Sequence, residues 1–97
     1  MPAARIPDSA TVVVTAGVLS STFDEEFVIL NLDSGIYYGL EQVGARIWDL
    51  IQRPASVGSI RDTLVSEYEV DPGRCERDLQ ALLADLAAKG LVRIELA

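Results

Sequence analysis

The chain has 97 residues, 49% of them hydrophobic, and its 8 basic and 15 acidic residues give a formal net charge of −7. This length supports one domain with a modest core. The negative charge argues against nonspecific binding to nucleic acid or anionic lipid, because phosphate neutralisation requires clustered Lys and Arg. We therefore expect a single soluble domain over residues 1–97, with the polar, proline-containing residues 1–10 flexible.

No targeting or membrane segment is predicted. No apolar run reaches the roughly 18 to 20 residues of a membrane span, and the apolar run that starts at Ala10 follows Pro7 and Asp8, where a signal peptide would carry basic residues. We expect a cytoplasmic protein without a membrane partner. Cys75 is the only cysteine and the sequence has no histidine, so neither a disulfide nor a Cys/His site is available. Cys75 is expected to lie in the core.

The front of the chain has the pattern of a small antiparallel β-meander. Residues 12–23 are mostly Val, Thr, Ser and Leu and predict a strand, and Asp24-Glu25-Glu26 predicts a turn into a second strand, FVILNL. Asp33-Ser34-Gly35 predicts a tight turn, because Gly tolerates positive φ and Asp and Ser bond their own backbone. A third strand, IYYGL, follows. The residues before Val18 leave two alternatives open, an additional strand or a disordered arm.

The rest of the chain has helical spacing in three segments. Apolar residues after Leu40 recur on one face until Pro54, Ser56 predicts the cap of a second helix, and Asp71-Pro72 predicts the start of a third that ends at Gly90. The alternating tail VRIEL is compatible with a short final strand. The predicted buried faces comprise Val43, Ile47, Leu50, Ile51 and the flanking Trp48, then Val57, Ile60, Leu64 and Tyr68, then Cys75, Leu79, Leu82, Leu83 and Leu86.

This order predicts an α+β fold in which a three-stranded antiparallel β-meander packs on three helices. The arrangement is winged-helix-like, and such modules usually bind DNA through the third helix. Here that helix has no basic face to offer a phosphate backbone. Its three basic residues are matched by three acidic ones: Arg74, Arg77 and Lys89 against Glu76, Asp78 and Asp85. We therefore expect no nucleic-acid partner, and DNA binding is the less favoured alternative.

The residues offer no recognisable catalytic centre. Without histidine, the acid–base candidates are carboxylates, Lys89 and tyrosines, and none of them has a catalytic spacing. The run Asp24-Glu25-Glu26 is better explained as turn residues than as a metal site, because consecutive carboxylates point in different directions. The dispersed glycines form no phosphate-binding loop. We expect no enzymatic activity, no catalytic residues, no metal and no cofactor.

The third predicted strand is apolar on both faces. Alternation places Ile36, Tyr38 and Leu40 on one face, with Tyr37 and Gly39 on the other. As the last strand of a meander it would lie at the edge of the sheet, where unpaired backbone groups form a template for an added strand. The alternative is that the tail strand or the third helix covers this edge.

Two stretches, FVILNLDSGIYYGLEQVGARIWDLI and SIRDTLVSEYEVDPGRCERDLQALLADLAAKGLV, resemble the PqqD-like proteins. These are the RiPP recognition elements found with lasso-peptide and other ribosomal-peptide modification systems. The resemblance runs from Val18 to Val92 and rests on the Asp33-Ser34-Gly35 turn, the YYGL strand, the VGARIW helix and the YEVDP junction. In form the chain is most similar to the stand-alone lasso-peptide members, which occur beside a separate leader peptidase and a cyclase.

The resemblance implies that the chain binds the leader segment of a precursor peptide and presents it to the leader peptidase and possibly the cyclase. It also implies that the leader docks as an extra strand on the third strand, in a groove whose other wall is the third helix. The alternative within the family is the PqqD role itself, as a peptide chaperone for a radical enzyme in quinone cofactor synthesis. Carried onto this sequence, the peptide-binding residues are Ile36, Tyr37, Tyr38, Gly39, Leu40, Arg74, Asp78, Ala81, Leu82 and Asp85.

Overall fold

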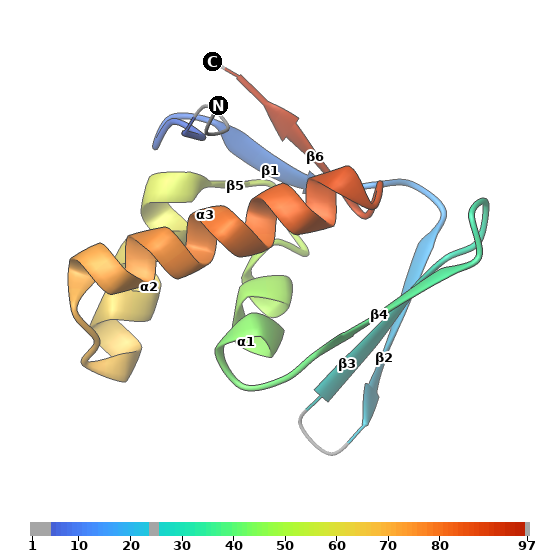
Figure 1. Ribbon diagram of the computed structural model, residues 1–97, viewed down its shortest axis with the longest axis horizontal. Helices are drawn as coiled ribbons and strands as arrows, with labels where there is room; N and C mark the ends of the chain where they lie inside the picture. Colours follow the sequence, from blue (N-terminus) through green and yellow to red (C-terminus); the bar gives the residue numbers. More distant parts are fainter. Residues whose placement is uncertain (1–4, 24–25, 97) are drawn as a thin grey trace.

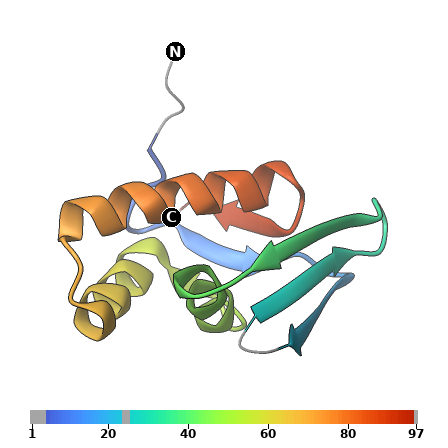
Figure 2. The ribbon, with the colours of Figure 1, turned by 60° about the horizontal axis from the view of Figure 1, so that its bottom comes forward.

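The computed structural model describes residues 5–23 and 26–96. In the described residues three helices follow the strands of the first half of the chain, as predicted, but these strands are four and not the predicted three (Figure 1 and Figure 2). In chain order the elements are β1 (Thr11–Val14), β2 (Val18–Phe23), β3 (Glu26–Asn31), β4 (Ile36–Leu40), α1 (Val43–Leu50), β5 (Ala55–Ser56), α2 (Val57–Tyr68), α3 (Pro72–Ala88) and β6 (Val92–Glu95). None of the helices in the described part has the length and apolar character that a bilayer crossing requires.

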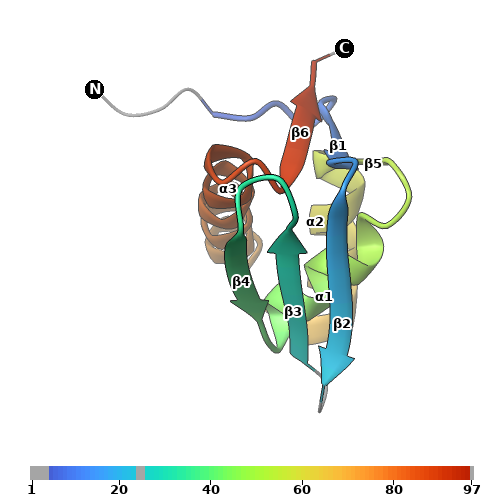
Figure 3. The ribbon, with the colours of Figure 1, turned by 90° about the vertical axis from the view of Figure 1, so that its right-hand side faces the viewer.

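The strands of the described residues form two antiparallel sheets. One has the order β2-β3-β4 and is the predicted meander, and the other has the order β5-β1-β6. On the meander's inner face, Ile29 lies opposite Ser20 and Tyr38 and is fully buried. Figure 3 shows this sheet standing in front of α1 and α2, with β1 and β6 above it. The meander therefore has one face toward the helices and one face outward.

The prediction of one strand over residues 12–23 is wrong. Gly17 has a φ of +84°, a conformation that Gly adopts at little cost, and the chain turns there. The first half of the predicted strand, β1, enters the second sheet, where Val12 lies opposite Ile94 and is fully buried. Of the two alternatives for the residues before Val18, the additional strand is thus the observed one, and the tail does form a strand, β6. In the predicted turn, Asp24 and Glu25 lie outside the described residues, and Glu26 already belongs to β3.

The predicted helix boundaries are confirmed by their caps. The Asp71 side chain accepts a hydrogen bond from the Arg74 N–H at 2.9 Å, and the Ser56 hydroxyl accepts one from the Ser59 N–H at 3.2 Å. These bonds satisfy backbone donors that the first turn of a helix leaves without an intrahelical partner. The starts of α3 and α2 are therefore determined by local residues.

A Schellman motif ends α3. Gly90 has a φ of +71°, its N–H donates to the Ala87 carbonyl at 3.0 Å, and the Leu91 N–H donates to the Leu86 carbonyl at 3.0 Å. Leu86 and Leu91 are both fully buried, so the hydrophobic contact typical of this motif forms as well. The motif directs the chain from α3 into β6.

The core lies between the meander, the helices and the second sheet. Its largest fully buried side chains are Trp48, Ile29, Ile51, Ile60, Leu64, Leu79, Leu83, Leu86, Leu91, Val12 and Val57. Cys75 is buried as predicted, and burial raises the pKa of its thiol. Two predicted core residues, Val43 and Tyr68, are instead exposed. They are the first residue of α1 and the last of α2, where each helix extends beyond the elements that cover its middle.

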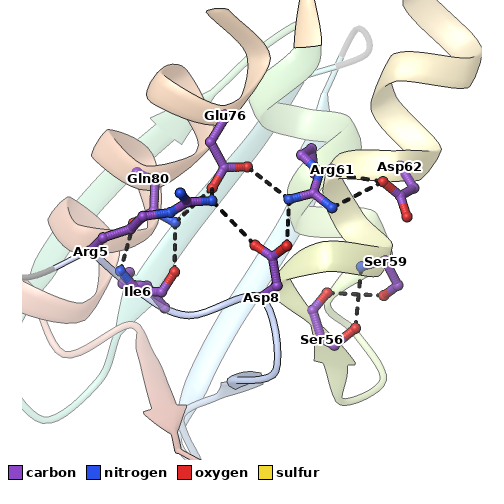
Figure 4. A network of polar contacts seen from close by, with 9 residues as sticks. All are labelled: Arg5, Ile6, Asp8, Ser56, Ser59, Arg61, Asp62, Glu76 and Gln80. Carbon is purple, nitrogen blue, oxygen red and sulfur yellow. Dashed lines mark hydrogen bonds and ion pairs between the residues drawn. The ribbon is translucent and has the colours of Figure 1, made fainter. Parts of the chain in front are cut away.

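Residues 5–8 lie against α2 and α3 (Figure 4). The Ile6 N–H donates to Gln80 Oε1 and Gln80 Nε2 donates to the Ile6 carbonyl, both at 2.8 Å. Arg61 contacts Asp8 at 2.8 Å and Glu76 at 3.2 Å, joining this segment to both helices. The flexibility expected for residues 1–10 stays a prediction. Motion of residues 5–8 would require these hydrogen bonds and ion pairs to open.

Asn31 joins the meander to the end of α3. It is the one buried polar residue among those described. Its Nδ2 donates to the Gly90 carbonyl at 3.2 Å, while Oδ1 accepts from the N–H groups of Asp33 at 3.0 Å and Ser34 at 3.3 Å. One side chain therefore closes the β3–β4 turn and holds it against the α3–β6 connection.

Replacing Asn31 with Ala is expected to lower the free energy of unfolding by about 1 to 3 kcal/mol, because it removes three hydrogen bonds made by a buried side chain. Ser21→Ala, an exposed change on β2, is the control and should stay within about 0.5 kcal/mol of wild type. Urea denaturation followed by circular dichroism measures both. Equal stabilities of Asn31→Ala and wild type would show that this side chain does not hold the turn.

Candidate functional site

The outer edge of β4 is unpaired by any strand of the described residues. β4 pairs with β3 along Ile36–Leu40, and it is the last strand in its sheet. The tail strand, which the alternative placed on this edge, pairs with β1 in the other sheet. β4 is thus an edge strand, as predicted, and an edge of this kind is a template for another strand. The third helix, which the alternative also named, lies beside this edge and is joined to it by the Tyr38–Asp85 hydrogen bond. Figure 3 shows that this edge is the one on the side of α3.

A cluster of three side chains connects β4 to α3. The Tyr38 hydroxyl donates to Asp85 Oδ2 at 2.5 Å, and Lys89 Nζ lies 2.6 Å from Asp85 Oδ1. Lys89 Nζ is also 5.2 Å from the centroid of the Tyr38 ring, within the range of a cation–π interaction. Because each member contacts the other two, the cluster fixes the Tyr38 side chain and with it the separation of β4 and α3.

These contacts change the acidity of two members. The hydrogen bond to Asp85, together with desolvation, raises the pKa of Tyr38 to about 12. Hydrogen bonds from Lys89 and Tyr38 lower the pKa of Asp85. The stability that Tyr38 contributes is therefore fully present below about pH 10, its ordinary pKa. This stability is lost as the pH rises through about 12. The contribution of Asp85 is present above its ordinary pKa and is lost as the pH falls through the lowered value.

A groove of about 700 Å³ lies between the three helices, and its described lining residues include none from β4. Gly44, in the first turn of α1, marks where they meet: a Cβ added there would lie 3.2 Å from a Leu40 methyl carbon and 3.9 Å from one of Leu82. A side chain on Gly44 would therefore require the Leu40 side chain to move by a few tenths of an ångström. The groove is lined by Gln42, Val43, Gly44, Ile47, Leu64, Tyr68, Glu69, Val70, Asp71, Arg74, Cys75, Asp78, Leu79 and Leu82.

The predicted helix-side residues fall in three places. Arg74, Asp78 and Leu82 line the groove, and Asp85 belongs to the cluster with Tyr38. Ala81 instead lines a separate hollow of about 450 Å³ on the other flank of α3, beside residues 5 and 6. Arg74 and Asp78 form an exposed ion pair at 3.9 Å, a type that contributes about 0 to 1 kcal/mol.

The predicted strand-side residues divide between the two faces of β4. Ile36, Tyr37 and Gly39 are exposed, Tyr38 is half-buried against α3, and Leu40 is buried beside the groove. Alternation along the strand thus predicted the environments correctly, except that the inward-facing Ile36 remains exposed at the end near the turn.

Sequence reasoning missed the part of the groove formed by α1 and the α2–α3 connection. Val43 and Tyr68 were expected in the core, and Gln42 and Val70 were not considered. The available signal was the position of these apolar residues at the ends of short helices. Such positions extend beyond the elements that pack on the middle of the helix.

A third hollow, of about 510 Å³, lies between the start of β3 and α1. Its central cation is already neutralised: Arg46 donates to both carboxylate oxygens of Glu67, at 2.9 and 2.8 Å, and to Asp49 at 2.6 Å. Arg46 therefore has its charge balanced within the chain, and binding a ligand through it would require these contacts to open.

Spectrophotometric titration at 295 nm tests the cluster. Wild type is expected to show a tyrosine ionising near pH 12, and Tyr38→Phe should remove that phase. Asp85→Asn should move the phase back toward about 10, the ordinary tyrosine value, whereas Tyr37→Phe should leave it in place. Far-UV circular dichroism at each pH verifies folding. A phase near pH 12 that survives in folded Tyr38→Phe would contradict the assignment.

Known proteins share this sequence pattern and fold. Residues 26–92 match the family described as coenzyme PQQ synthesis protein D, PqqD. The structure "TbiB1 in Complex with the TbiA(beta) Leader Peptide" aligns with a TM-score of 0.79 and 40% identity over 84% of this chain and 94% of that one. "Lasso peptide synthetase B1 complexed with the leader peptide" aligns with a TM-score of 0.75 and 28% identity over 84% and 96%. None of the curated proteins compared with the chain matches it.

The family match extends from the start of β3 to the start of β6 and so includes β4, the groove and α3. The resemblance inferred from the sequence is confirmed, as is the α+β fold. The chain belongs to the PqqD family of proteins.

Proposed function

We propose that the chain binds the leader segment of a ribosomally made precursor peptide as an added strand along β4. The observation that carries this proposal is the free edge of β4, held beside α3 by the Tyr38–Asp85 hydrogen bond. The groove between the helices begins just after this strand, at Gln42. The two similar structures described above are complexes with leader peptides. They support peptide binding as the function of this fold here.

Backbone hydrogen bonds to β4 would determine the leader's register, and apolar leader side chains in the groove would supply most of the affinity. Ordering a flexible leader opposes binding, so we expect dissociation constants from roughly nanomolar to micromolar. The Tyr38–Asp85–Lys89 cluster is already formed without a leader. By fixing β4 relative to α3 it reduces the ordering that binding must impose.

Charged residues at the rim would affect selectivity more than strength. Arg74 and Asp78 are solvent-exposed, and changes in exposed charges mainly alter association rates and discrimination between partners. A leader with an acidic or basic residue near Arg74 would therefore be distinguished chiefly by how fast it binds.

In this proposal the chain presents the leader to the peptidase and the cyclase of a lasso-peptide pathway in the cytoplasm, and it catalyses no step itself. Joining substrate and peptidase through one protein raises their effective concentration. A chaperone role for a radical enzyme in quinone cofactor synthesis uses the same groove. The similarity to the structure of lasso peptide synthetase B1 favours the first role.

Proline substitution along β4 tests strand addition. N–H groups of successive strand residues point alternately to the two sides, so Tyr37→Pro and Tyr38→Pro remove one donor toward β3 and one toward the open edge. The variant that loses the donor toward the open edge should remain folded and should bind a fluorescein-labelled leader at least about tenfold more weakly than wild type. Fluorescence polarisation measures this binding. The matched Tyr→Ala variant at the same position retains its N–H and is the control for the lost side chain.

The probes are the leader of the precursor encoded in the same gene cluster and the TbiA(beta) leader. Tight binding by a folded proline variant of the edge residue would place the leader elsewhere. Absence of binding by wild type to both leaders would contradict the proposed function itself.

A further inference from the structure

Residues 5–8 cross α3 and reach α2, and we name them the N-terminal strap (Figure 4). The Gln80 side chain binds both polar backbone groups of Ile6, since Oε1 accepts from the N–H and Nε2 donates to the carbonyl, each at 2.8 Å. Farther along the strap, the Asp8 carbonyl accepts from the Gly58 N–H of α2 at 3.1 Å. The strap precedes the segment that matches the PqqD family, so the family match does not account for it.

Glu76 of α3 is the centre of the polar contacts around the strap. Its side chain is only 16% exposed and accepts hydrogen bonds from Arg5 at 2.6 Å, Gln80 at 3.2 Å and Arg61 at 3.2 Å. Arg61, which belongs to α2, also donates to Asp8 at 2.8 Å. A carboxylate with so little exposure needs partners for its charge. The strap, α2 and α3 are therefore joined by one network of hydrogen bonds and ion pairs.

The strap and β4 contact opposite flanks of α3. Glu76, which contacts the strap, and Asp85, which contacts Tyr38 of β4, are nine residues apart. Nine residues make about two and a half turns of a helix with 3.6 residues per turn, so these two side chains point in opposite directions. The meander thus holds the C-terminal end of α3, and the strap holds its N-terminal half.

The N-terminal half of α3 also forms one wall of the groove. Four of its residues line the groove: Arg74, Cys75, Asp78 and Leu79. Glu76 and Gln80 are interspersed with these four in the sequence and contact the strap instead. One segment of helix therefore has the groove on one side and the strap on the other. Its position relative to α1 and α2 determines the width of the groove.

We propose that the N-terminal strap positions α3 for leader binding, and that Gln80, Glu76 and Arg61 are positioning residues that hold the groove wall in place. This inference rests on the proposed function, in which apolar side chains of the leader enter the groove. A wall that is held before the leader binds reduces the ordering that binding must impose. Coupling between two sites is reciprocal, so a bound leader must in turn stabilise the contacts of the strap.

Gln80→Leu tests the inference, because it removes both hydrogen bonds to Ile6 and keeps a side chain of similar size. Gln52→Leu is the matched control, since Gln52 Nε2 donates to the Trp48 carbonyl at the same distance, 2.8 Å, at the end of α1. Fluorescence polarisation measures the Kd of each full-length protein for the two labelled leaders named above. Amide hydrogen exchange of ¹⁵N-labelled wild type measures the opening of the Ile6–Gln80 contact, with and without saturating leader. Far-UV circular dichroism verifies folding and gives the melting temperatures.

Gln80→Leu is expected to weaken leader binding at least about fivefold, the lower end of the usual range for coupled sites. Gln52→Leu should stay within about twofold of wild type, because distant changes act independently. In wild type, saturating leader should slow exchange of the Ile6 amide by a factor similar to the loss of affinity in Gln80→Leu. A strap that only stabilises the fold would lower the melting temperature of Gln80→Leu without changing either of these readouts.

Three results overturn the inference. A folded Gln80→Leu variant that binds the leader like wild type would assign the strap to stability alone. Exchange of the Ile6 amide that saturating leader leaves unchanged would show that the two flanks of α3 are not coupled, and this measurement needs no variant to fold. Failure of wild type to bind either leader would contradict the proposed function and this inference with it, and the Kd of wild type alone identifies that case.

Discussion

The arrangement of β4 relative to α3 depends on two side-chain bridges. Asn31 bonds the end of α3 and closes the β3–β4 turn, and Tyr38 donates to Asp85 farther along the same strand. The apolar contacts of the core have no such directional preference. Because both bridges are hydrogen bonds with defined geometry, they determine the distance across which a bound strand must fit.

This constraint gives β4 three separate surfaces. Its inner face holds Tyr38 against Asp85 of α3 and Leu40 beside Gly44 of α1, its edge presents backbone groups, and Tyr37 is exposed on its outer face. In our account the inner face and the edge bind the leader.

Local signals predicted much of the fold. Asp71-Pro72 and Gly90 mark the ends of α3 because capping depends on neighbouring residues. The second sheet was not predicted, since β1 pairs with a strand about 80 residues away. Periodicity identified the buried helix faces but not where covering elements stop, so Val43 and Tyr68 were misplaced. Tyr38 and Asp85 were both expected in the site, yet their bond spans 47 residues and needs the folded chain.

The meander has two edges, and this provides an internal control for strand addition. β2 is the opposite edge strand of the same sheet, but it lies on the side away from α3. Amide hydrogen exchange of the ¹⁵N-labelled protein, with and without saturating leader, compares the two edges in one experiment. The account predicts slower exchange of outward-pointing amides on β4, with the amides of β2 unchanged. Slower exchange on β2, or no change on β4 when the leader is bound, would contradict it.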